Sequence, residues 1–243
     1  MHNPADLPAS PLLNEMRLDQ FAFAPADTMR PLLASSGGLA DWNDFADSWN
    51  QLGPDPYLAA KGRARRRRHA TFSAVADGGV TPEPHQPHFQ SLQYNALQGD
   101  IERWFEPITE AIVHGTTLRS ILHFCHAFFG SLAPAVARWH IEVHQFRIEA
   151  TASAAGEPTP EGSHRDGVDY VLVMLINRTN ISSGTTTIHD RDGKQLGSFT
   201  LAQPLDSAFV DDERVFHGVT PVLPVDGTRP AFRDVLVVTL KKH

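Results

Sequence analysis

The chain has 243 residues, a formal net charge of −7 at pH 7 and a single cysteine. This length suffices for one large domain with its own core, whereas the negative charge argues against a nucleic-acid partner and one cysteine excludes an internal disulfide. The first residues lack a secretory signal, and no apolar stretch reaches the roughly 20 residues that cross a bilayer. We therefore expect a soluble cytoplasmic protein that binds neither nucleic acid nor membrane.

The N-terminal quarter has a different composition from the rest of the chain. Residues 1–60 are rich in Pro, Ala and Asp, and MRPLLASSGGLADWNDFADSWNQLG predicts short helices separated by turns. We expect a helical extension packed on a core domain over 61–243, the two forming one structural unit. The run KGRARRRRHATF contains Arg63 and Arg65 to Arg68 and resembles a nucleic-acid patch or a sorting signal. A strand that continues to Phe72 is the simpler interpretation, with some arginines in solvent and one or two turned inward to meet a carboxylate.

The rest of the chain passes from a helical to a strand period. Residues 97–130 carry apolar side chains at spacings of three and four, which predicts two helices that support a sheet. From residue 139 onward the period is two, and it predicts seven strands: WHIEVHQFRIEA, DYVLVMLIN, GTTTIHD, KQLGSFTLA, DSAFVDD, RVFHGV and FRDVLVVTLKK. Asp192-Gly193 signals a type I′ hairpin turn, and the continuous apolar run DYVLVMLI indicates a strand covered on both sides. The expected fold is mainly β with a helical outer layer, a double-sheet jelly roll.

Two histidines and an aspartate form the most specific chemical pattern. His164 and Asp166 are followed 51 positions after the aspartate by His217. In an extended segment His164 and Asp166 point the same way, with Arg165 opposite, and His217 arrives from a distant strand. Two imidazoles and one carboxylate are the facial triad of non-haem Fe(II) oxygenases, which leaves metal positions open for co-substrate and dioxygen.

Other histidines have ordinary explanations. His140 and His144 have the i, i+4 spacing of a metal pair on a helix, but they lie in a predicted strand, which separates them by about 13 Å. We interpret both as structural. His123 and His126 flank Cys125 in an apolar helix, where core packing explains all three.

The C-terminal half resembles the Fe(II)- and 2-oxoglutarate-dependent dioxygenases of the bacterial free amino-acid hydroxylase type, nearest to the isoleucine 4-hydroxylase family. The resembling segments are HQFRIEA, PTPEGSHRDGVDYVLVMLINRTNISSGTTTIHD, LDSAFVDDERVFHGVTPV and FRDVLVVTL. The resemblance implies a cupin-like double-stranded β-helix in which His164, Asp166 and His217 hold Fe(II), with 2-oxoglutarate and O2 as co-substrates. It also implies an arginine on the last strand that holds the distal carboxylate of 2-oxoglutarate, here Arg233.

The residues themselves also favour Arg233, because a planar guanidinium grips a carboxylate with two bonds and this arginine opens a strand. Arg229 is the rival, although it lies in the loop GTRPA just before a proline. A free amino acid needs binding partners for its carboxylate and for its ammonium group, and the candidates are Arg147, Gln145, Arg165, Asp211 and Asp212. Arg147 ranks first because Gln145 and Arg147 share a strand face with Ile141 and Val143.

The expected activity is hydroxylation of a free aliphatic L-amino acid such as leucine, isoleucine or methionine, or of a close derivative, with release of succinate and CO2. Two alternatives remain: a non-catalytic cupin-like regulator that binds a metal or ligand, and a zinc enzyme on the same fold. The triad together with Arg233 favours the dioxygenase. A homodimer is compatible with the sequence, which does not define the oligomeric state or the role of residues 1–60.

Overall fold

The structure, a computed structural model, describes residues 9–59, 65–76, 78–94 and 99–243. The helices are α1 (Ser10–Asp19), α2 (Ala26–Ser35), α3 (Trp42–Asp47), the 3₁₀ helix η2 (Ser48–Gln51), α4 (Pro56–Ala59), α5 (Glu110–Val113) and α6 (Thr116–Leu132). The strands are β1 (Phe21–Ala24), β2 (Arg65–Val75), β3 (Val80–Pro82), β4 (Arg138–Ala150), β5 (Tyr170–Thr179), β6 (Ile181–Ser183), β7 (Thr185–His189), β8 (Gln195–Thr200), β9 (Ser207–Asp211), β10 (Phe216–Val219), β11 (Val222–Pro224) and β12 (Ala231–Lys242). Within these ranges, no helix is long and apolar enough to cross a membrane.

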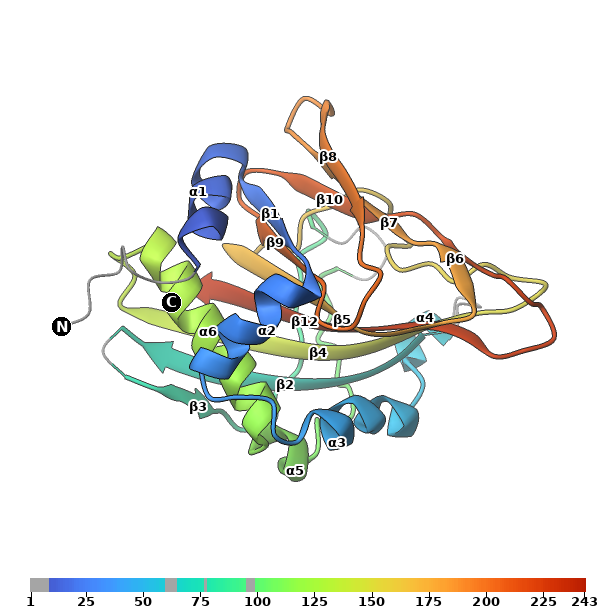
Figure 1. The fold of residues 1–243 in the computed structure, drawn as a ribbon, viewed down its shortest axis with the longest axis horizontal. Coiled ribbons are helices and arrows are strands. Elements are labelled where there is room, and N and C mark those ends of the chain that lie inside the picture. Colours follow the sequence, from blue (N-terminus) through green and yellow to red (C-terminus); the bar gives the residue numbers. More distant parts are fainter. Residues whose placement is uncertain (1–8, 60–64, 77, 95–98) are drawn as a thin grey trace.

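The strands form a jelly roll, as the period-two pattern predicts. A seven-stranded antiparallel sheet in the order β1-β9-β5-β12-β4-β2-β3 is the major layer (Figure 1). A three-stranded sheet, β10-β7-β8, and a two-stranded sheet, β11-β6, are the smaller units. All seven predicted strands are present, and the short strands β6 and β11 add to them.

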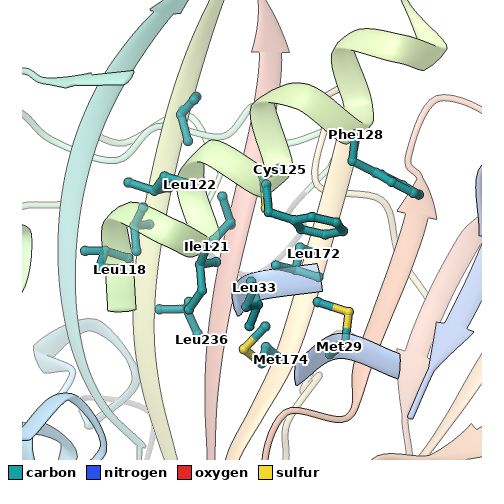
Figure 2. Packing of buried hydrophobic residues seen from close by; sticks show 14 of the residues in the cluster. Met29, Leu33, Leu118, Ile121, Leu122, Cys125, Phe128, Leu172, Met174 and Leu236 are labelled. Carbon is teal, nitrogen blue, oxygen red and sulfur yellow. The ribbon is translucent and has the colours of Figure 1, made fainter. Parts of the chain in front are cut away.

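Helix α6 lies across the outer face of the major sheet, with α2 beside it (Figure 1). The apolar residues of α6 recur at spacings of three and four, so one side of the helix packs on the strands. Figure 2 shows the resulting contact layer, made of Met29, Leu33, Leu118, Ile121, Leu122, Cys125, Phe128, Leu172, Met174 and Leu236. Cys125 is a buried free thiol within this layer, as its apolar surroundings predict.

The long strands of the major sheet are buried on both faces. In β5, Leu172 and Met174 lie under the helices, whereas Val171 and Val173 line an internal cavity. The expectation that DYVLVMLI is covered on both sides is therefore confirmed. One face of the sheet therefore packs in the hydrophobic core, and the other face lines the cavity.

The N-terminal segment contains the expected helices and also a strand. β1 pairs with β9 from Phe21 with Val210 to Ala24 with Ser207, so it forms one edge of the major sheet. The Trp49 indole nitrogen donates to the backbone oxygen of Phe146 on β4 (3.1 Å). Residues 9–59 are therefore joined to the sheet by backbone pairing as well as by side-chain packing.

Two local predictions need correction. Of the two helices expected over 97–130, the first has only four residues, because Pro107 and its neighbours pair with β2 through a bridge at His69 instead. β7 and β8 do form a hairpin, but in the turn between them, which the structure describes in full, Gly193 alone has a positive φ (83°). The turn is closed by a bond from the Asp190 N–H to the Lys194 oxygen (2.9 Å), so it is not the type I′ turn that Asp192-Gly193 suggests.

Candidate active site

The three residues of the predicted triad meet at one end of the cavity. His164 and His217 are antiparallel backbone partners, since the N–H of each donates to the oxygen of the other (2.9 Å for both bonds). Asp166 lies two residues further along an extended segment. Its carboxylate oxygens are 3.6 Å from His164 Nε2 and 3.4 Å from His217 Nε2.

This arrangement fits a divalent metal. Three ligands on one face of an octahedron with bonds of about 2.1 Å lie about 3 Å apart, which is close to the observed separations. Burial lowers the pKa of His164, but the charges of Asp166 and Glu161 outweigh it and raise that pKa to about 9. Burial likewise raises the pKa of Asp166, and hydrogen bonds from the two histidines bring it well below its ordinary value. The carboxylate therefore attracts positive charge to the point where a dication would bind.

Asp212 holds the segment that carries Asp166 in place. Its carboxylate accepts hydrogen bonds from the backbone N–H groups of Asp166 (2.9 Å), Gly167 (2.8 Å) and Val168 (3.2 Å). Its Oδ1 also lies 3.7 Å from His217 Nδ1, the ring nitrogen opposite the triad. Gly167 has a φ of +83°, which a side chain would strain, so the turn after Asp166 requires glycine. Burial and the nearby charge of Asp166 raise the pKa of Asp212.

A segment far away in sequence also contacts the triad. The Gln90 side-chain amide donates to Asp166 Oδ1 (3.2 Å) and to the Asp166 backbone oxygen (3.3 Å). Arg103, which is buried, in turn donates to Gln90 Oε1 (2.8 Å). Asp166 is therefore held from two sides, by Asp212 through the backbone and by Gln90 through the carboxylate.

The cavity has a volume of about 460 Å³, and both the triad and Arg233 line it. Arg233 is only 2% exposed, and its Nε and Nη2 have no hydrogen-bond partner among the described residues. Burial and the charge of Arg178, its cross-strand neighbour, lower the pKa of Arg233 to about 10. An unpaired buried cation is costly, so this guanidinium is suited to receive an anion. The exposed Arg229 does not line the cavity.

The four central strands give the cavity a polar side and an apolar side. Cross-strand partners form rows that run from β2 through β4 and β12 to β5. One row is His69, His144, Val237 and Val173, and the next row on the same face is Thr71, Glu142, Thr239 and Val171. Arg67, Glu142 and His144 lie on β2 and β4, whereas β5 and β12 contribute valines, with Arg233 and Lys241 near the two ends of β12.

The residues expected to grip a substrate do not lie together. Gln145 and Arg147 do share a face with Ile141 and Val143, but that face is covered by the N-terminal elements and does not line the cavity. Arg147 pairs with Asp234 through two bonds of 2.7 Å, and Gln145 donates to the Ser48 hydroxyl (2.8 Å). The preference for Arg147 rested on the wrong face of β4.

The other three candidates lie beside the triad segment without lining the cavity, and Asp212 holds that segment as described above. Arg165 is half-buried between the rings of Tyr94 and Phe216 and donates to the Glu213 backbone oxygen (3.1 Å). Asp211 ends β9 and is half-buried, and burial raises its pKa to about 6. Neither has a contact that suggests substrate binding.

The sequence interpretation missed the polar side of the cavity. Arg65 and Arg67 do turn inward and meet a carboxylate, that of Asp55 (2.8 and 3.8 Å), as the alternation predicts. Glu142 and His144, however, line the cavity, whereas His144 was interpreted as structural. The signal that could have found them is the alternation along β4, which places both on the face opposite Ile141 and Val143.

Comparison with known proteins places this chain among related enzymes. A family profile described as 2OG-Fe dioxygenase matches residues 46–239. The chain is 28% identical to the 3(1)-hydroxy-L-isoleucine 4-dioxygenase of Pantoea ananatis over 92% of both chains. It is 28% identical to the L-isoleucine-4-hydroxylase of Bacillus thuringiensis, covering 74% of this chain and 76% of the relative. The crystal structure of a bsmA homolog from Methylobium petroleophilum PM1 superposes with a TM-score of 0.85 at 37% identity, covering 100% of this chain and 97% of that one.

Proposed function

Because the chain belongs to the 2OG-Fe dioxygenase family, whose members use Fe(II), 2-oxoglutarate and O2, we propose that His164, Asp166 and His217 hold the iron. We further propose that Arg233 binds the distal carboxylate of 2-oxoglutarate and that the substrate is a free aliphatic L-amino acid or a close derivative. The observation that carries this proposal is the buried guanidinium of Arg233, with two unpaired nitrogens, in the same cavity as the convergent side chains of His164, Asp166 and His217.

The chain's own residues would position the reactants. Fe(II) held by the triad would supply the activation of O2 for a reaction that converts 2-oxoglutarate to succinate and CO2 and hydroxylates the substrate. Arg233 would hold 2-oxoglutarate by a charge-assisted pair of hydrogen bonds. Asp212 and Gln90 would keep Asp166 oriented, a role that neighbours of metal ligands commonly have. The valines of β5 and β12 would exclude water and direct an aliphatic side chain toward the metal.

The amino-acid class is supported by the cavity and by the relatives. Two relatives are named for isoleucine or a hydroxylated isoleucine, and each is 28% identical to this chain. The apolar wall suits an aliphatic side chain such as that of leucine, isoleucine or methionine.

The test is a screen of the proteinogenic L-amino acids with anaerobically iron-loaded protein, 2-oxoglutarate and O2. We expect succinate that depends on one or a few aliphatic amino acids, with a product heavier by one oxygen atom. If the protein binds 2-oxoglutarate but couples no amino acid, the proposed substrate class is wrong. If it does not bind 2-oxoglutarate, the role of Arg233 is wrong as well, and a regulator or a zinc enzyme becomes the better interpretation.

A further inference from the structure

A cluster of buried polar side chains lies on the β2 and β4 side of the cavity. The polar cluster consists of Arg67, His69, His88, Glu142 and His144. The three imidazole rings are packed together, with centroids 4.8 Å apart for His69 and His144 and 4.9 Å apart for His88 and His144. Such a concentration of buried polar groups is costly unless it is satisfied by its neighbours or by a ligand.

Glu142 is at the centre of the polar cluster and is incompletely paired. His88 Nδ1 lies 2.6 Å from Glu142 Oε2, and His144 Nε2 lies 3.5 Å from the same oxygen. The other oxygen, Oε1, has His69 and His140 at 3.7 Å, which is longer than a hydrogen bond. The side chain keeps 13% of its surface exposed and lines the cavity, so a ligand can reach it.

Arg67 is the matching cation. It is almost fully buried between the rings of Phe105 and Phe146, with its guanidinium carbon 3.5 and 4.6 Å from their centroids. Its Nη2 lies 2.8 Å from His144 Nδ1, and its Nε has no hydrogen-bond partner among the described residues. One imidazole ring, that of His144, therefore separates Arg67 from Glu142.

The three histidines and Glu142 also have the spacing of a metal site, with ligand atoms within 4.8 Å of one another. Arg67 argues against that use. A guanidinium only donates, so His144 Nδ1 must accept and His144 Nε2 must carry the proton toward Glu142. A metal would need the lone pair of that same Nε2, and it would have to approach the Arg67 cation.

We propose that the polar cluster binds the charged head of the amino-acid substrate, with Glu142 accepting hydrogen bonds from its ammonium group and Arg67 donating hydrogen bonds to its carboxylate. This inference rests on the proposed function and names the residues that would select an α-amino acid. An anion and a cation on two sides of one ring match a head group that carries both charges on one carbon. The row from His144 to Val237 and Val173 then gives the aliphatic side chain an apolar path across the sheet.

The test compares three probes that differ by one charged group. Binding of L-isoleucine, 3-methylpentanoate (no ammonium) and 2-methylbutylamine (no carboxylate) is measured by calorimetry on anaerobic protein loaded with Fe(II) and 2-oxoglutarate. Wild type should bind L-isoleucine about tenfold to hundredfold more tightly than either analogue. Glu142→Gln should abolish the preference over 3-methylpentanoate alone, and Arg67→Met the preference over 2-methylbutylamine alone.

Glu149→Gln and Arg66→Met are the matched controls, because this exposed pair lies on the same two strands and points away from the cavity. Both controls should keep the wild-type ratios. Unchanged ratios in Glu142→Gln would overturn the inference even if Arg67→Met did not fold, as would a second metal ion bound per chain in wild type. If wild type binds L-isoleucine but Glu142→Gln and Arg67→Met keep the wild-type ratios, the inference is wrong while the proposed function stands. If wild type binds none of L-isoleucine, L-leucine and L-methionine, the proposed function fails with it.

Discussion

The two faces of β4 both carry charged side chains, but the charges are paired in different ways. On the outer face, Arg147 meets both carboxylate oxygens of Asp234 at 2.7 Å. On the inner face, Glu142 has one close partner, His88, and three histidine nitrogens at 3.5 to 3.7 Å. The outer pair is complete in itself, whereas the inner group retains capacity for a ligand. Incomplete pairing next to a cavity is therefore a better guide to binding than the presence of charge.

The same contrast distinguishes the arginines of the molecule. Arg147 is fully engaged by Asp234 and Asn50 and stacks on Phe232 (4.0 Å). Arg233 is more deeply buried than Arg147 but leaves two nitrogens without a described partner. If this difference separates structural from functional charges, replacing the paired Arg147 should lower the stability of the protein, whereas replacing the unpaired Arg233 should lower its affinity for a ligand.

The largest effect is expected at the metal ligands. Asp166→Ala or His217→Ala should reduce succinate formation to the detection limit, because two ligands cannot hold an ion as three do. The thermal stabilisation that added Fe(II) gives to wild type should also disappear, since that stabilisation requires binding to the folded state. Scanning calorimetry with and without Fe(II) measures it. His114→Ala, at an exposed histidine directly after α5, is the control. If Asp166→Ala or His217→Ala kept the normal stabilisation by Fe(II), the triad would not be the binding site of the ion.

Next in size is the outer face of β4. Arg147→Met should lower the free energy of unfolding by about 3 kcal/mol, because it leaves the buried Asp234 carboxylate unpaired. The KM values for 2-oxoglutarate and for the amino acid should stay unchanged. Urea unfolding and steady-state kinetics on the same preparation separate the two effects. A clear rise in either KM would return Arg147 to the binding site and remove the contrast between the faces.

How much of this could be predicted depends on the kind of information each feature needs. That His164 and Asp166 point the same way was predictable from their local spacing, and the strands were predictable from their period, whereas the place of His217 beside them was indicated by the resemblance to a known family. The choice of face on β4 was not, since Ile141 and Val143 show only that one face is apolar. Whether that face meets helices or a cavity depends on α2, α6 and η2, which pack from elsewhere in the chain.

The polar cluster shows the same limit more sharply. His69, His88 and His144 come from three separate segments, and no spacing in the sequence brings them together. Gln90 contacts Asp166 and Arg103 contacts Gln90, and both residues lie outside the helices and strands, so neither period could reveal them. The sequence thus predicts sites made by short motifs, but not sites made by tertiary packing alone.

Arg233 tests whether an unpaired arginine is a functional one. Arg233→Ala should raise the 2-oxoglutarate concentration for half-maximal activity at least thirtyfold, because losing a buried charge pair costs about 2 kcal/mol or more. Iron binding should persist, since Arg233 makes no contact with the triad that the structure records. Arg229→Ala is the matched control in the exposed turn before β12. An equal response of the two variants would exclude Arg233 as the specific anchor.

Asp212 should have a smaller effect than the ligands it holds. Asp212→Asn keeps the shape of the side chain but weakens its bonds to the backbone of Asp166, Gly167 and Val168 and its contact with His217. Metal affinity should fall about tenfold to hundredfold, as for other residues that orient metal ligands. A metal-competition titration gives the affinity directly. Wild-type affinity in this variant would show that Gln90 and the backbone alone position Asp166.

The smallest effect is a pH dependence from Asp55, the buried carboxylate that Arg65 and Arg67 contact. Burial raises the pKa of Asp55, but Arg65 and Arg67 outweigh it, so the folded pKa is lower than 3.8. A depressed carboxyl pKa gives stability that is present above the unfolded pKa and lost as pH falls through the folded pKa. Asp55 should therefore account for a loss of less than about 0.5 kcal/mol between pH 7 and pH 4, and for more below that. Urea unfolding of wild type and Asp55→Asn at pH 7, 4 and 3 should show the difference between them shrinking as pH falls. A constant difference would mean that Asp55 stabilises by shape and hydrogen bonds rather than by its charge.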